Sequence, residues 1–197
     1  MHSLILIIGV FCLNVYAQNN SSIPKIVETH CMSCHSNYTI IDSPLMAGQK
    51  KDFIAFELFN FRDKLRVHEI MNQVMEGYTD REVKEMAVYI SKLSLCEAQA
   101  QVDEHPNANV EKGKEIFQGS CFACHQKDTF GIGPVLHGQK TWYIEYAIKS
   151  FQSSWHKPRP SRLNMKNHTD MLSEQDIKDV AAYLNEQKLC EISPLYY

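Results

Sequence analysis

The sequence has no basic excess, because its 20 Lys and Arg are outnumbered by 23 Asp and Glu and the formal net charge is −3. This balance argues against nucleic acid as a partner. After residue 17, no stretch is long and apolar enough to span a bilayer. The chain also lacks a convincing series of strand patterns, so the expected fold class is all-α.

Residues 1–17 have the pattern of a signal peptide. The apolar run from Leu4 to Val15 is too short for an easy membrane span and ends in Val15-Tyr16-Ala17, which resembles a signal-peptidase site. No Lys or Arg precedes the run, so an uncleaved N-terminal anchor is the competing interpretation. We expect cleavage, a mature chain that begins near Gln18, and a location in the periplasm with no membrane span.

One five-residue motif occurs twice, as Cys31-Met32-Ser33-Cys34-His35 and as Cys121-Phe122-Ala123-Cys124-His125. Two cysteines three apart, followed directly by histidine, form the attachment signature of c-type haem. The thiols of Cys31, Cys34, Cys121 and Cys124 would form thioethers, and His35 and His125 would bind iron. A single match also fits a zinc or redox site. Two matches at an offset of 90 positions predict two covalently bound haem c groups.

The segments between the motifs repeat as well. The stretch from Pro44 to Gln49 matches that from Pro134 to Gln139 at the same offset of 90, whereas the later pairs match at an offset of 94. Four residues are therefore inserted in the second unit, within 152–160. The mature chain is predicted to be two copies of one module, with domain 1 at 18–96, a polar linker at 97–109 and domain 2 at 110–197.

Each copy is expected to contain about three helices around its haem. The first begins near Ser22 or Asn109 and ends on the haem motif, and the middle ones cover about 52–60 and 142–151. In the middle helix of unit one, the apolar stripe is predicted to be Phe53, Phe56 and Phe59 or Leu58. In unit two, Gly113 could permit close packing of the first helix.

The last helices have the clearest start signals. Thr79 with Glu82, and Ser173 with Asp176, resemble capping boxes. Apolar residues then recur at i, i+3, i+4 and i+7 in both units, as Val83, Met86, Ala87 and Ile90, and as Ile177, Val180, Ala181 and Leu184.

The repeat also narrows the choice of a sixth iron ligand, which can be methionine, a second histidine or an open site. Met71 and Met165 are equivalent, each eight residues before its cap residue, at the end of the loop before the last helix. They are the predicted ligands. His68 and His168 are rivals at unequal offsets. Met46, Met75, Met86, Met171 and His156 are further candidates without an equivalent partner.

Two further features surround these sites. Pro44 and Pro134 each follow a motif histidine by nine residues, so their carbonyls are candidate acceptors for the second ring nitrogen. Basic residues flank the methionines and could form a rim that steers an acidic partner, although an ordinary solvated loop explains them as well; they are Arg62, Lys64, Arg66, Lys157, Arg159, Arg162 and Lys166.

Cys96 and Cys190 remain after the haem thiols and Cys12 are set aside. They are equivalent, each seven residues after Tyr89 or Tyr183. In an oxidising compartment they could form a disulfide. Two buried thiols that end equivalent helices are the alternative.

With these motifs in place, the chain resembles the cytochrome c4 family and the related dihaem subunit of flavocytochrome c sulfide dehydrogenase. The resemblance implies two class I cytochrome c domains packed about a pseudo-twofold axis. It also implies His35/Met71 and His125/Met165 ligation, with proline carbonyls behind the histidines. The segment Gly77-Tyr78-Thr79 is similar to the sulfide dehydrogenase subunit, and the loop after Cys34-His35 lacks the glycines typical of cytochrome c4.

Three functions follow from this. The first is an electron carrier between redox proteins, such as a respiratory complex and a terminal oxidase. The second is the electron-accepting subunit of a flavoprotein that oxidises sulfide. The third, a dihaem enzyme such as a peroxidase or thiosulfate dehydrogenase, would need an open or cysteine-ligated iron, against which the paired methionines argue.

Overall fold

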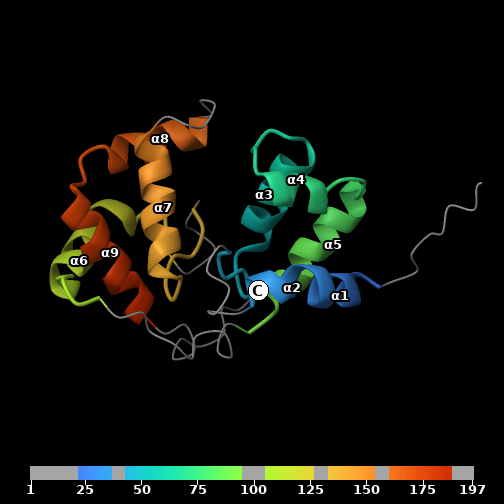
Figure 1. The fold of residues 1–197 in the computed structure, drawn as a ribbon, viewed down its shortest axis with the longest axis horizontal. Coiled ribbons are helices and arrows are strands. Elements are labelled where there is room, and N and C mark those ends of the chain that lie inside the picture. The colour runs from blue at the N-terminus through green and yellow to red at the C-terminus, as the bar shows by residue number, and fades with distance from the viewer. Residues whose placement is uncertain (1–21, 37–42, 95–104, 127–132, 154–159, 188–197) are drawn as a thin grey trace, which may run out of the picture.

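The computed structural model describes residues 22–36, 43–94, 105–126, 133–153 and 160–187, and the side chains of the last range from residue 165. Throughout these ranges the regular structure is helical, which confirms the all-α prediction. Figure 1 shows two groups of helices, α1 to α5 in unit one and α6 to α9 in unit two.

The helices follow the repeat. Unit one contains α1 (Ile23–Ile26), a π-helical turn (Val27–Cys31), α2 (Met32–His35), α3 (Lys51–Arg62), α4 (Glu69–Val74) and α5 (Asp80–Ser91). Unit two contains α6 (Val110–Ile116), a second π-helical turn (Phe117–Cys121), α7 (Thr141–Gln152), α8 (Pro160–Thr169) and α9 (Glu174–Glu186). Both π-helical turns end on the first cysteine of a motif, and such turns are frequent at functional sites.

The predicted start signals of the last helices are confirmed. Thr79 accepts a hydrogen bond from the Glu82 backbone N–H and the Glu82 carboxylate accepts one from Thr79, as a capping box requires. Ser173 and Asp176 form the same arrangement at α9. The four predicted apolar residues of each last helix are all buried.

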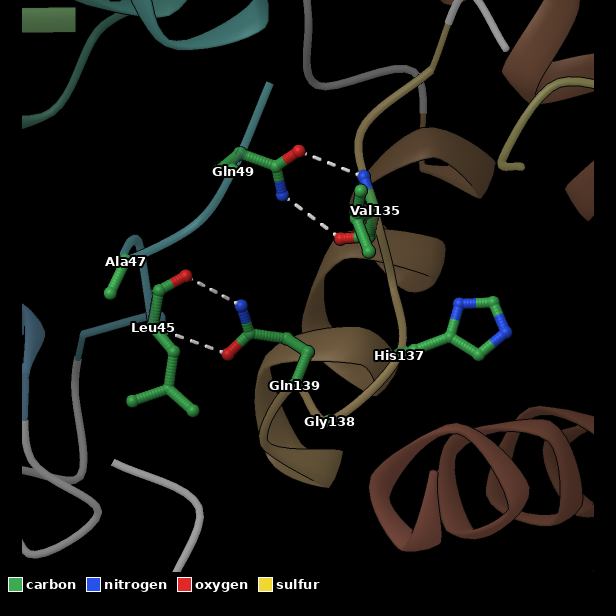
Figure 2. Close-up of a pocket in the computed structure, with 7 residues that line it drawn as sticks. All are labelled: Leu45, Ala47, Gln49, Val135, His137, Gly138 and Gln139. Atoms are coloured by element: carbon green, nitrogen blue, oxygen red, sulfur yellow. Dashed lines mark hydrogen bonds between the residues drawn. The ribbon is translucent and has the colours of Figure 1, made fainter. Parts of the chain in front are cut away.

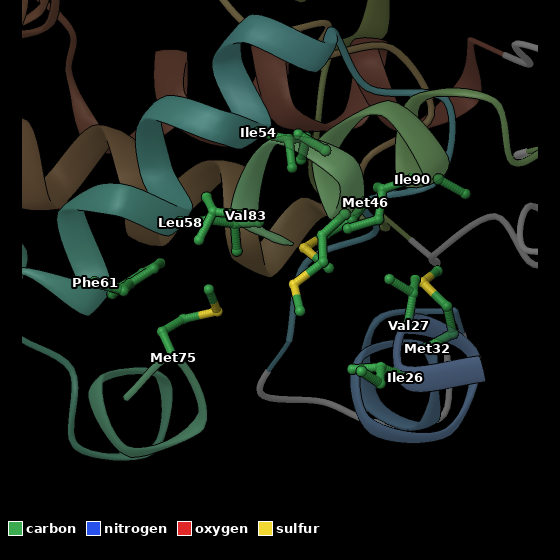
Figure 3. Packing of buried hydrophobic residues seen from close by; sticks show 13 residues of the cluster. Ile26, Val27, Met32, Met46, Ile54, Leu58, Phe61, Met75, Val83 and Ile90 are labelled. Atoms are coloured by element: carbon green, nitrogen blue, oxygen red, sulfur yellow. The ribbon is translucent and has the colours of Figure 1, made fainter. Parts of the chain in front are cut away.

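The core of unit one forms where α3 and α5 meet the first helix, as Figure 3 shows. The predicted stripe of the middle helix is confirmed at Leu58 and wrong at Phe56. α3 buries Ile54, Leu58 and Phe61, whereas Phe56 is 44% exposed. The spacing of four and three residues follows the helical period, and a stripe read from the aromatic residues alone is rotated away from it.

The segments that carry Met71 and Met165 are also different from the expected loops. Each forms a helix of its own, α4 and α8. The N-cap of α4 is His68, whose Nδ1 accepts a hydrogen bond from the Met71 N–H at 3.3 Å. Histidine is not among the usual capping residues, so the start of α4 carries no standard sequence signal.

Close contact between the first and last helices of unit two confirms the role predicted for Gly113. A Cβ at Gly113 would lie 2.0 Å from the carbonyl oxygen of Asp179 on α9. Any larger residue would therefore push α6 away from α9. Through this contact α6 packs closely against α9. Because α6 leads into the haem motif, the start of the motif is positioned next to the last helix.

Candidate functional site

The two motif histidines are held in the same way. His35 Nδ1 donates to the Pro44 carbonyl at 2.7 Å, and His125 Nδ1 donates to the Pro134 carbonyl at 2.8 Å. Both rings are buried, at 9% and 5% exposed. These bonds fix the tautomer and leave Nε2 as the ring nitrogen for a metal. The predicted role of the two proline carbonyls is confirmed.

The surroundings of both histidines favour the neutral imidazole. Burial lowers the pKa of His35, and the charges of Lys140 and His68 lower it further, whereas the bond to Pro44 acts in the opposite direction. Burial likewise lowers the pKa of His125, with Lys50 and His168 adding to the effect against the bond to Pro134. Neutral imidazole is the form that binds iron.

The motif cysteines are thiols without a disulfide partner. Burial raises the pKa of Cys31 to about 11, and the neighbouring Cys34 adds to this. Burial and Cys124 do the same for Cys121, also to about 11. Both first cysteines of the motifs are therefore protonated thiols at neutral pH before anything is attached to them.

The units differ directly behind the motif. In unit two, a Cβ at Gly133 would lie 2.6 Å from Cε1 of His125, so only glycine fits beside the ring. Its N–H donates to the Cys124 carbonyl at 2.8 Å. In unit one Ser43 takes this place, and its hydroxyl donates to the Cys34 carbonyl. Each motif is thereby tied to the segment that carries its proline.

These residues fit a covalently attached haem. Each motif provides two free thiols one helical turn apart and a buried neutral imidazole whose Nδ1 is already bonded. Among the described residues, no group of three or more His, Cys, Asp or Glu side chains is arranged to hold a metal ion by itself. A porphyrin that supplies the remaining ligands agrees with this donor set, and a structural zinc does not.

The methionine helices are anchored in the same way in both units. Asn72, which follows Met71, donates to the Phe61 carbonyl at the end of α3 at 2.6 Å. Lys166, which follows Met165, donates to the Gln152 carbonyl at the end of α7 at 2.8 Å. Both methionines are half-buried.

The two units meet through a reciprocal pair of glutamines, shown in Figure 2. Gln49 accepts from the Val135 N–H at 2.8 Å and donates to the Val135 carbonyl at 2.9 Å. Gln139 accepts from the Leu45 N–H at 3.0 Å and donates to the Leu45 carbonyl at 2.9 Å. Equivalent residues exchange equivalent bonds, which is the signature of a twofold contact.

A second contact between the units involves Arg66. It forms an ion pair with Glu57 and hydrogen-bonds with Tyr143 of the other unit. Although burial opposes its charge, Tyr143 and Glu57 raise the pKa of Arg66. Arg62 and Lys64 also pair with carboxylates, at Asp63 and Asp80 and at Glu76. The basic residues of unit one therefore form ion pairs within the protein, which leaves them less available to steer a partner.

Several sequence predictions fall outside the described residues. Cys96 and Cys190, the segment 1–17, and the insertion residues His156, Lys157 and Arg159 are among them. Within the described ranges, none of the helices has the length and apolar character needed to cross a bilayer.

Sequence reasoning missed the glutamines. Gln49 and Gln139 were matched as a repeat, but a polar residue in a loop gave no sign that it would be buried against the other unit. Their equivalence combined with burial, at 8% exposed for both, is the signal that identifies them.

Comparisons with known proteins agree with this site. The cytochrome c family model matches residues 110–188. Cytochrome c-554(548) from Halomonas halodenitrificans is 37% identical over 73 residues, which cover 36% of this chain and 87% of that protein. Cytochrome c4 from Pseudomonas aeruginosa is 22% identical over 197 residues, which cover 92% of this chain and 95% of that protein.

Two further relatives extend the comparison. A thiosulfate dehydrogenase electron acceptor from Thiomonas intermedia is 25% identical over 174 residues, which cover 81% of this chain and 79% of that protein. The structure of cytochrome c4 from Acidithiobacillus ferrooxidans matches with a TM-score of 0.63 and 24% identity, over 79% of this chain and 96% of that one. The chain belongs to the cytochrome c family, and it is an electron-transfer protein of the dihaem cytochrome c4 type with two covalently bound haem c groups.

Proposed function

We propose that the protein is a periplasmic carrier of single electrons in which His35 and Met71 bind one haem iron, and His125 and Met165 bind the other. One observation carries this proposal. Met71 and Met165 are equivalent in the sequence repeat and lie on α4 and α8, and the side chain of the residue after each one ties its helix to the end of the preceding helix. Two methionines held alike in both units match the Met/His ligation of cytochromes c.

The other methionines are less suited to the role. Met75 and Met86 are fully buried in the apolar core of unit one, at 1% exposed each. Met171 is 86% exposed. His68 precedes α4 as its N-cap, where the ring is already used, whereas His168 lies near the end of α8.

Bound haem supplies a one-electron ferric/ferrous couple, and the protein residues tune and connect the two couples. The Pro44 and Pro134 carbonyls hold each imidazole in one orientation and tautomer. Burial of His35 and His125 limits the access of water to the proximal ligands. The Gln49 and Gln139 hydrogen bonds hold the two units in one relative position, so an electron that passes between them follows a fixed path.

Carbon monoxide binding to the ferrous holoprotein tests the ligands. We expect no rapid binding to the native protein, about one CO per chain for Met71→Ala or Met165→Ala, and none for the control Met171→Ala. Methionine ligation blocks the sixth position until the side chain is removed. Rapid CO binding to the native protein would contradict the proposal and favour a dihaem enzyme.

We propose an oxidoreductase of reduced inorganic sulfur compounds as the electron donor. The name of the Thiomonas intermedia relative, thiosulfate dehydrogenase electron acceptor, supports this class. The test is to mix the ferric protein with a thiosulfate-oxidising dehydrogenase and thiosulfate, and to follow the haem bands. Reduction that depends on both is expected. Reduction only by unrelated donors would reject this class.

A second candidate is the electron-accepting subunit of a flavoprotein that oxidises sulfide. It is favoured by the segment Gly77-Tyr78-Thr79, in which Gly77 adopts a φ of +87° two residues before Thr79, the cap of α5. Purification from the native host separates the two candidates. Flavin that co-elutes in a fixed ratio, with haem reduction by sulfide, would establish the subunit. Haem alone, unresponsive to sulfide, would leave the free carrier.

A further inference from the structure

Lys140 is a buried lysine that reaches from unit two into unit one. It follows Gln139 at the interface, and its side chain is 1% exposed. Its ammonium group donates to the Ser43 carbonyl of unit one at 2.9 Å. Lysine is almost never fully buried in a protein unless it is paired, and the Ser43 carbonyl is one of the partners of Lys140.

The segment that Lys140 contacts is the one that orients the haem ligand. Ser43, Pro44 and Leu45 are consecutive, and the Pro44 carbonyl accepts the bond from His35. Lys140 binds the carbonyl on one side of Pro44, and Gln139 binds both backbone groups of Leu45 on the other. Two adjacent residues of unit two therefore hold the proximal segment of unit one from both ends.

The position of Lys140 also carries an electrostatic consequence. Its charge acts on the His35 ring, and both residues are buried, so bulk solvent screens this charge only weakly. A positive charge in such surroundings disfavours additional positive charge nearby more strongly than it would in water. Ferric haem carries one more positive charge than ferrous haem, so a cation beside its ligand favours the ferrous state.

We propose that Lys140 of unit two raises the reduction potential of the haem bound by His35 in unit one, so that one unit tunes the redox centre of the other. This inference rests on the proposed electron-carrier function. Lys140 acts here as a positioning residue: it holds the Ser43–Leu45 segment and places its charge next to the ligand.

The lysine that acts on the histidine of unit two is Lys50 of unit one, and it differs from Lys140 in burial. Lys50 follows Gln49, and its charge acts on His125 just as that of Lys140 acts on His35. Lys50 is only partly buried, however, so its charge is better screened by solvent. The same crossed arrangement is thus strong in one direction and weak in the other, which would separate the potentials of two otherwise similar haems.

The test uses Lys140→Met and Lys50→Met in the full-length holoprotein, with spectroelectrochemical titration resolved into two one-electron components. Methionine keeps a similar volume and removes the charge. We expect Lys140→Met to shift one component about tenfold toward the ferric state, which equals about 59 mV. Lys50→Met should shift the other component by less, and Lys140→Arg should restore most of the native value.

The outcomes separate the inference from the function on which it rests. The inference is supported if each variant shifts only one redox component, and if Lys140→Met and Lys50→Met shift different components. Unchanged potentials in Lys140→Met, or equal shifts of both components, would overturn it while leaving the carrier function intact. Thermal unfolding of each variant serves as the control. If Lys140 has only a structural role, Lys140→Met should be less stable than the native protein, and Lys140→Arg should fail to restore the native reduction potential. Failure of the native haems to undergo reversible reduction would instead reject the carrier function.

Discussion

The first and last helices cross differently in the two units. In unit two, Gly113 lets α6 lie directly against the backbone of α9. In unit one, Ile23 occupies the equivalent position, and a groove of about 400 Å³ runs between α1 and α5. Its lining includes Ile23 and Glu85, which are the counterparts of Gly113 and Asp179. The crossing that is closed by backbone contact in unit two is thus bordered by a groove in unit one.

The comparison shows which parts of the repeat are essential to the site. The histidine bonds to Pro44 and Pro134, the capping boxes and the reciprocal glutamines are the same in both units. The helix crossing and the residue behind the motif are not. The site therefore depends on the segments that hold the proximal ligand, and the outer helix pair can vary around it.

The largest effect on stability is expected from Gly113→Ala, which disrupts the close crossing of α6 and α9. The new Cβ would overlap the Asp179 carbonyl, and the backbone must move to relieve it. We expect a loss of about 3 kcal/mol in the free energy of unfolding, as for overpacked cores, measured by denaturant unfolding followed by circular dichroism.

Gly119→Ala is the matched control, because a Cβ there would meet nothing within 4 Å. Its effect should stay within about 1 kcal/mol. A Gly113→Ala protein as stable as this control would show that the crossing is not tight.

The next largest effect concerns the feature that the units share. Gln49→Leu and Gln139→Leu each leave a buried N–H and a buried carbonyl of the other unit unpaired. Each should cost about 2–3 kcal/mol, and the two costs should agree to within about 1 kcal/mol, because the contact is reciprocal. Denaturant unfolding of both variants measures this. A large cost for one and none for the other would mean that the contact is not symmetric.

The smallest effect is a pH dependence common to both capping boxes. Hydrogen bonds from the Thr79 hydroxyl and N–H lower the pKa of Glu82, and those of Ser173 lower the pKa of Asp176. Because the folded pKa values are depressed, this stabilisation is full above the unfolded values of about 4.3 and 3.9 and is lost as the pH falls through the folded ones.

The double variant Glu82→Gln/Asp176→Asn tests this. At pH 7 it should be less stable than the native protein by about 0.5 kcal/mol per cap, a small value because both carboxylates are exposed. The difference should vanish in acid, as monitored by thermal unfolding across pH. A difference that persists at low pH would assign the effect to packing.

More of the site can be predicted from the sequence than of the helices and buried side chains that hold the site in place. The haem motifs, the proline carbonyls and the caps are local patterns, each set by a few neighbouring residues, and the proline carbonyls and the caps were confirmed. The helical form of α4 was missed, because its cap is a histidine. The buried face of α3 was predicted only in part, because the aromatic Phe56 stood out more than the aliphatic Ile54. Burial of Lys140 and Arg66 depends on the other unit, and no local pattern contains that information.

The reciprocal glutamine contact has a consequence for how the protein behaves on dilution. A self-complementary contact of this kind usually joins two separate subunits, whose association weakens as the protein concentration falls. Here both halves belong to one chain, so each half meets the other at a fixed effective concentration. Exchange of an electron between the halves is then a first-order process, and its rate should be the same at nanomolar and at millimolar protein.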